Sequence, residues 1–144
     1  MVESAIQSRL TTSLLPAAMA NVSVRFGVNP SERQGNPDNK RWVVHFRNGS
    51  DPHDTKSGRS TLDTVSYQVN IFAYTADDVR ILSMAVRLLL DRIPAGEYGA
   101  AGVFIQSSRL TNEVSLFEFE DMYNGRGVYQ VTQYYDIRTT PQYG

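Results

Sequence analysis

The chain has 144 residues, a hydrophobic share of 41%, and fourteen basic against fifteen acidic side chains, for a formal net charge of −1. This length fits one domain spanning residues 1–144, and the composition argues against a disordered chain. The absence of cysteine excludes disulfides, thiolate metal sites and cysteine nucleophiles, and the balanced charge disfavours tight nucleic-acid binding, which draws on a basic excess.

No apolar run approaches the roughly 18 residues that a membrane span needs, and no signal peptide opens the chain. We therefore expect no membrane association and synthesis in the cytoplasm.

Apolar residues recur every four positions over residues 1–15, which predicts a helix with one buried face that ends before Pro16. Strands are predicted at Val22–Phe26 and at 42–46, with a polar loop over residues 29–40 between them. In the second of these strands Trp42 and Phe46 are expected to point into the core, and His45 is expected to be half-exposed.

The next strand, at residues 65–74, alternates most clearly, with one apolar face and a polar face that becomes aromatic near its end. Thr75 and Asp78 then form a variant of the capping box, which predicts the start of a helix that runs to about Ile93. Its apolar positions predict a largely buried helix; they are Val79, Ile81, Leu82, Ala85, Val86, Leu88, Leu89 and Ile93.

Three further strands are predicted, at residues 103–105, 114–119 and 128–137. Strands joined by turns favour antiparallel pairing. The expected fold is therefore α+β, a two-layer arrangement with a mainly antiparallel twisted sheet, two helices packed on one face, and long polar loops.

The residue types needed for catalysis or metal binding do not occur in a suitable pattern. His53, with Asp51 and Asp54 beside it, could suggest a metal site, but one histidine and two carboxylates on a loop lack ligand spacing. Glu118 and Glu120 occupy one side of a strand, where they read as a solvated strand end. Phosphate-binding glycine motifs are also missing. We expect a protein that is not an enzyme, with no cofactor and no metal.

The order of residues resembles the tail terminator, or tail-completion, family of long-tailed, lambda-like bacteriophages. The resemblance lies in Tyr67-Gln68-Val69-Asn70-Ile71-Phe72-Ala73-Tyr74-Thr75, followed by Ala76-Asp77-Asp78 and by Val86-Arg87-Leu88-Leu89-Leu90-Asp91. It continues in the acidic run before Tyr129-Gln130-Val131 and in Asp136-Ile137-Arg138. The two long polar loops, 29–40 and 48–60, depart from the family pattern.

The resemblance implies a virion protein of the head–tail interface. Six copies would form a ring on the end of the tail tube, stop its polymerisation and provide the surface that joins the head. Its partners would be itself, the tail tube protein and a head-completion or connector protein, while DNA passes through the channel without specific binding.

Residues 48–60 contain no apolar side chain beyond a proline, and we refer to them as the polar arm. A structureless connection of this length is usually functional or mobile. We predict that the polar arm, with Arg47 just before it, contacts the tail tube or a neighbouring subunit. The candidate contact residues are Arg47, Asp51, His53, Asp54, Lys56 and Arg59. The alternative is that the polar arm is a tolerated surface loop.

Three other functions stay open on the sequence. One is another head–tail connector or minor tail subunit. A second is a small cytosolic ligand-binding domain or enzyme, which predicts a deep pocket. A third is a single-strand nucleic-acid module, which predicts salt-dependent binding.

Overall fold

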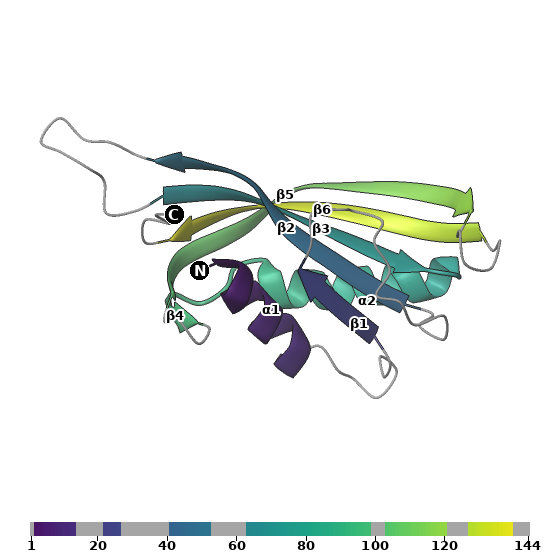
Figure 1. Ribbon diagram of the computed structural model, residues 1–144, viewed down its shortest axis with the longest axis horizontal. Coiled ribbons are helices and arrows are strands. Elements are labelled where there is room, and N and C mark those ends of the chain that lie inside the picture. The colour runs from purple at the N-terminus through teal and green to yellow at the C-terminus, as the bar shows by residue number, and fades with distance from the viewer. Residues whose placement is uncertain are drawn as a thin grey trace, which may run out of the picture.

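The computed structural model (Figure 1) describes residues 2–13, 22–26, 41–52, 63–98, 103–120 and 127–139. In chain order these residues form α1 (Val2–Ser13), β1 (Val22–Phe26), β2 (Arg41–Pro52), β3 (Asp63–Ala73), α2 (Ala76–Leu90), β4 (Gly96–Tyr98), β5 (Val103–Glu120) and β6 (Gly127–Thr139). Neither described helix is long and apolar enough to span a membrane.

The strands make one six-stranded sheet in the order β1-β2-β3-β6-β5-β4. Every neighbouring pair is antiparallel except β1 and β2, which are parallel. The prediction of a mainly antiparallel sheet is confirmed, but the expectation that consecutive strands pair antiparallel is wrong for β1. A parallel pair needs a long crossover, and residues 27–40 are long enough to supply one.

Both helices lie on the same side of the sheet, as Figure 1 shows, so the predicted two-layer α+β fold is confirmed. The core between the layers combines buried residues from α1, such as Ile6 and Leu10, with Leu82 and Val86 from α2. The sheet contributes the apolar face of β3; its residues are Val65, Tyr67, Val69, Ile71 and Ala73. This is the alternation that the sequence predicted for that strand.

A second buried cluster lies on the sheet face turned away from the helices. Trp42 stacks on Phe72 with ring centroids 5.1 Å apart, and Tyr74 meets the same indole edge-on at 5.8 Å. Phe46 packs against this cluster, whereas Val43 belongs to the core beneath the helices. Trp42 is thus buried and Phe46 packs beside it, as expected, but in a cluster on the sheet face away from the helices, because β2 buries apolar residues on both faces.

β5 is one strand of 18 residues where the sequence predicted two short ones. It pairs with β6 along its length, with shifts of register after Ile105, Leu110 and Phe117. The polar residues between the two predicted strands are mostly exposed, so they carry no apolar alternation. Backbone pairing with β6 does not require apolar side chains, which is why the periodicity missed them.

α2 begins as predicted, because the Asp78 N–H donates to the Thr75 hydroxyl at 3.1 Å. Among the described hydrogen bonds the reciprocal bond from the Asp78 side chain is not present. The helix ends at Leu90, earlier than predicted, and Asp91 caps it. Arg92 then takes a left-handed backbone conformation with φ of 58°, which turns the chain toward β5.

Ser108 of β5 fastens this end of α2. Its hydroxyl donates to the Leu90 carbonyl at 2.6 Å and accepts from the Ile93 N–H at 2.8 Å. Its carbonyl accepts from the Arg92 N–H at 2.9 Å, and the Asp91 carboxylate accepts from the Leu110 N–H at 2.9 Å. The Leu-Asp pair on which the family resemblance partly rests therefore joins the helix to the sheet.

Candidate interaction surfaces

The polar arm begins inside β2, so the prediction of a structureless loop over residues 48–60 is wrong for residues 48–52. β2 and β3 are paired up to Pro52 and Asp63, and residues 53–62 connect them. Asp51 lies in the last paired stretch, opposite Thr64. The four remaining arm candidates, His53, Asp54, Lys56 and Arg59, lie outside the described residues. Their role as a contact surface stays a prediction.

Arg47, the first of the candidate residues, forms an ion pair within the fold. Its Nε and Nη2 atoms lie 2.8 and 2.7 Å from Glu3 Oε1, and the side chain is only 24% exposed. The pair ties β2 to the start of α1. Two residues 44 positions apart form it, so no local sequence signal could have revealed it.

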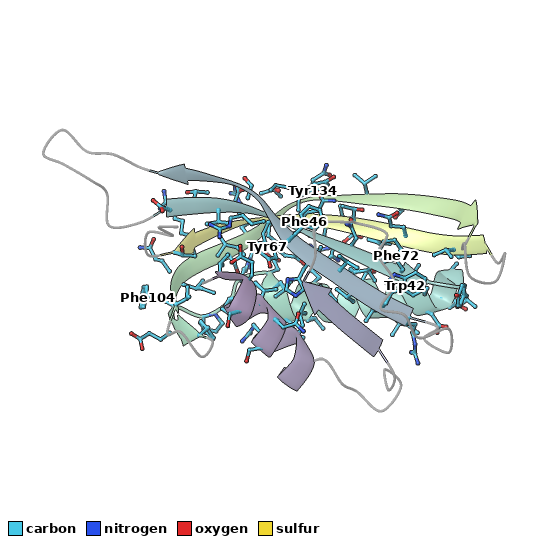
Figure 2. All side chains as sticks on the ribbon, viewed as in Figure 1. Trp42, Phe46, Tyr67, Phe72, Phe104 and Tyr134 are labelled. Atoms are coloured by element: carbon cyan, nitrogen blue, oxygen red, sulfur yellow. The ribbon has the colours of Figure 1, made fainter. Side chains whose placement is uncertain are left out.

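His45 is fully buried, so the expectation of a half-exposed histidine is wrong. The Tyr67 hydroxyl donates to its Nδ1 at 2.6 Å, and its Nε2 donates to Gln7 Oε1 at 2.5 Å, which fixes a neutral imidazole between β3 and α1. Figure 2 shows Tyr67 on the helix-facing side of the sheet. Burial lowers the pKa of His45 from 6.5 to about 4 and raises the pKa of Tyr67.

A second buried polar group lies beneath α2. Gln133 is fully buried, and its amide nitrogen donates to the Ser83 carbonyl at 2.9 Å and to Glu113 Oε2 at 3.0 Å. The Tyr135 hydroxyl donates to the Gln133 oxygen at 2.6 Å, and burial raises the pKa of Tyr135. With every polar atom of Gln133 paired, this group is suited to fixing α2 on β6.

The described sheet has two free-standing edges, β1 with five residues and β4 with three. Edge strands carry unpaired N–H and C=O groups that can pair with another chain. Because β4 pairs only with residues 103–105, residues 106–120 of β5 have no strand neighbour on that side among the described residues, and this long edge is open to pairing with another chain.

α2 exposes an apolar stripe, defined here as Ile81, Met84 and Leu88, whose exposed fractions are 43%, 58% and 81%. The predicted burial of Ile81 and Leu88 is therefore wrong. The buried residues of α2 occupy a narrower face; they are Val79, Leu82, Ser83, Val86 and Leu90. The exposed side of the helix also carries Asp77, Arg80 and Arg87, so the apolar stripe lies among charged residues.

An open depression of about 600 Å³ lies where the end of α2 meets the sheet. Arg92, Arg109 and Arg138 line it together with Asp136, and its other lining residues are Thr64, Ser107 and Ser108. All three arginines are exposed, and in the described part of the chain none of them forms an ion pair. We call this site the arginine depression. Its arginines come from three separate elements, so no sequence motif could have predicted it.

The arginine depression shares one residue, Arg92, with a second hollow beside α2. The other residues that line this hollow are Met84, Arg87, Leu88 and Asp91. An apolar surface bordered by arginines has the composition of the central part of many protein–protein interfaces. Among the described residues no three His, Cys, Asp or Glu side chains gather closely enough to hold a metal ion.

No family model matches the sequence, and no curated protein matches it. Among solved structures, the fold matches a chain from the structure titled "Virion of native gene transfer agent (GTA) particle" with a TM-score of 0.60 and 12% sequence identity. The match covers 97% of this chain and 95% of that chain. At this identity the likeness shows the fold, which this protein shares end to end with a component of a virion.

Proposed function

We propose that this protein is a structural subunit of a phage-like virion. The observation that carries the proposal is the fold match, because it extends over nearly the whole of both chains and leaves no large additional part in either. The surfaces of the molecule support it, since its exposed apolar stripe and arginine depression suit contacts with other protein chains.

Within the virion, we propose the role of tail terminator, as a ring of six copies on the end of the tail tube. The ring would end tube polymerisation and present the surface that receives the head. The segment that resembles the terminator family forms β3, the Thr75 cap and α2, a continuous unit at the centre of the fold. The protein would be made in the host cytoplasm and reside at the head–tail interface of the particle.

The proposed partners are a second copy, the tail tube protein and a head-completion or connector protein. DNA would pass through the ring without specific binding, in keeping with a net charge of −1. The proposal assigns no catalytic step. A head–tail connector or minor tail subunit is the second candidate, because the virion likeness fits those positions equally.

The test is to mix the purified protein with purified tail tubes and to image the particles by negative stain, with the protein carrying a gold label on its C-terminal end. A terminator adds one ring at one end of each tube and stops elongation when tube subunits are supplied. Label along the tube, label at the head vertex, or tubes that elongate without limit would contradict the terminator role. The first two outcomes would favour the second candidate.

A further inference from the structure

The open edge of β5 begins beyond Ile105, where β4 ends its pairing. The side chains of residues 111–115 are all exposed, so this stretch of the strand faces solvent. Residues 112–117 pair with β6 in an unbroken register, and the register shifts lie before and after them. This stretch therefore offers a regular row of backbone groups to a further strand.

One hydrogen bond indicates which backbone groups point to the open side. The Glu113 N–H donates to Asn112 Oδ1, a side-chain oxygen of the preceding residue, at 2.9 Å. A local bond of this kind satisfies an N–H group that has no strand carbonyl beside it. Because the direction of the N–H groups alternates along a strand, the Ser115 N–H points to the same open side.

β5 carries few of the features that normally protect an open edge. Proteins block such edges with lysine, proline, bulges or a covering element. β5 contains neither lysine nor proline. Glu113 is the one charged residue among the exposed residues 111–115, and its carboxylate is held by Gln133 Nε2 at 3.0 Å. An edge with so little protection is suited to cover by a partner strand.

The opposite edge of the same sheet is also one-sided. Among the described strands β1 pairs only with β2, and its five residues, Val22–Phe26, match the regular stretch 112–117 in length. Figure 1 shows β1 and β5 on opposite sides of the sheet. Four strand spacings, about 19 Å, separate them within one molecule, so the two edges can meet only between copies.

The directions of the strands suit this meeting. β2, β3, β6 and β5 alternate in direction, and β1 runs parallel to β2, so β1 and β5 run in opposite directions. When copies stand in the same orientation around an axis, β1 of one copy therefore reaches β5 of the next in the antiparallel direction. The parallel pairing of β1 with β2 is what makes this junction antiparallel.

We propose that β1 of one copy pairs with the open edge of β5, residues 112–117, of the next copy, so that the sheets of neighbouring subunits join. The contact is heterologous, and repeating it with the right rotation closes a ring. The inference rests on the proposed ring and names the strands that build it. The other possible occupant is β5 of a second copy, which would give closed dimers and leave β1 unpaired.

Cysteine crosslinking tests the contact, because the chain has no cysteine of its own. The variant with Ser23→Cys and Ser115→Cys places one thiol on each edge. On capped tail tubes a short bismaleimide should join its copies into a ladder of covalent oligomers. Each single variant should give no such ladder. Ser23→Cys with Ser66→Cys is the matched control, since Ser66 is exposed but lies on β3, which has strands on both sides.

A proline tests the backbone directly. Ser115→Pro removes an N–H from the open side, where an edge strand tolerates proline. It should keep the fold, as thermal melts would show, and reduce capping by on the order of tenfold, because every junction of the ring loses a hydrogen bond. Ser115→Ala keeps the N–H and should cap tubes like the wild type.

The outcomes separate this inference from the function on which it rests. Capped tubes without a ladder, or folded Ser115→Pro that caps at wild-type level, would overturn the contact and leave the terminator role intact. Covalent dimers from Ser115→Cys alone would assign the edge to a second β5 and overturn the contact. A ladder formed at high protein concentration, by a protein that never caps tubes, would support the contact and overturn the proposed function.

Discussion

His45 is enclosed where both of its ring nitrogens already have partners, Tyr67 and Gln7, and Glu3 and Arg47 pair nearby. The imidazole is neutral in the fold, and its protonation would remove the acceptor of the Tyr67 hydroxyl. The cost of placing a charge there is what lowers the pKa of His45 to about 4.

This burial makes stability depend on pH. In the unfolded chain His45 takes up a proton near pH 6.5, while in the fold it does so only near pH 4. Below pH 6.5 the unfolded state therefore binds more protons, and the free energy of unfolding should fall by up to about 1.4 kcal/mol per pH unit. Urea unfolding between pH 7 and 5 measures the slope.

His45→Gln should remove this part of the slope, and His53→Gln, in the polar arm, serves as the matched control that should keep it. A wild-type stability that does not change between pH 7 and 5, or a slope that His45→Gln leaves intact, would contradict the assignment.

Ser108 carries a second prediction at the scale of one residue. Ser108→Ala removes the acceptor of the Ile93 N–H and the donor to the Leu90 carbonyl, at a position only 3% exposed. Leaving such groups unpaired should lower the free energy of unfolding by about 2 kcal/mol. The neighbouring exposed Ser107→Ala should change it by less than about 0.5 kcal/mol. Equal effects of the two substitutions in urea titrations would show that Ser108 does not fasten α2.

At the scale of elements, α2 divides its apolar residues between two environments. Leu82 is fully buried in the core, while Leu88 is 81% exposed on the outer side. The sequence pattern treats both as members of one wide stripe, because helical periodicity gives the direction of a side chain and not what covers it. Together with Ile81 and Met84, Leu88 forms a contiguous exposed apolar stripe, which is the kind of surface that a partner chain occupies.

Substitution can tell these environments apart. Leu82→Ala should lower the free energy of unfolding by about 2–5 kcal/mol, since it opens a cavity in the core. Leu88→Gln, which keeps a good helix former at an exposed site, should change it by less than about 0.5 kcal/mol. Chemical unfolding checks both. A large loss of stability in Leu88→Gln would place Leu88 in the folding core of the monomer and contradict an interaction role.

The elements that local sequence signals define were predictable. β3 shows strict alternation and Thr75 precedes α2 as a cap, and both signals lie within a few residues of the structure they specify. The parallel pairing of β1 and the continuity of β5 were not, because both depend on which strand lies alongside. A polar segment has no hydrophobic periodicity, so its sequence does not indicate which strand pairs with it.

The interaction surfaces were harder to predict than the fold. The sequence directed attention to the polar arm, where charges follow one another along the chain. The arginine depression instead collects Arg92, Arg109 and Arg138 from the end of α2, from β5 and from β6. Arg47 was predicted to make contacts and is held by Glu3 of α1. Only the three-dimensional structure distinguishes an arginine that forms an ion pair within the fold from one that is exposed and forms none in the described residues.

At the scale of the whole molecule, near-neutral charge hides an uneven distribution. Three exposed arginines line the arginine depression, and Asp136 is the one acidic residue among its lining residues. In the terminator role that we propose, the β2–β3 hairpin that bears the polar arm would provide a surface for the tail tube.

Residues 53–62, which include the outer part of the polar arm, can be replaced without disturbing the sheet, because β2 and β3 are paired up to Pro52 and Asp63. Replacing residues 53–62 with Asn-Gly, which favours a tight hairpin turn, should leave the free energy of unfolding within about 1 kcal/mol of wild type. If the arm contacts the tube or a neighbouring subunit, this variant should fold, as thermal melts would show, and fail to cap tubes in negative stain. A Gly/Ser segment of the original length, as control, separates the loss of side chains from the loss of reach. Normal capping by the shortened protein would make the arm a tolerated surface loop.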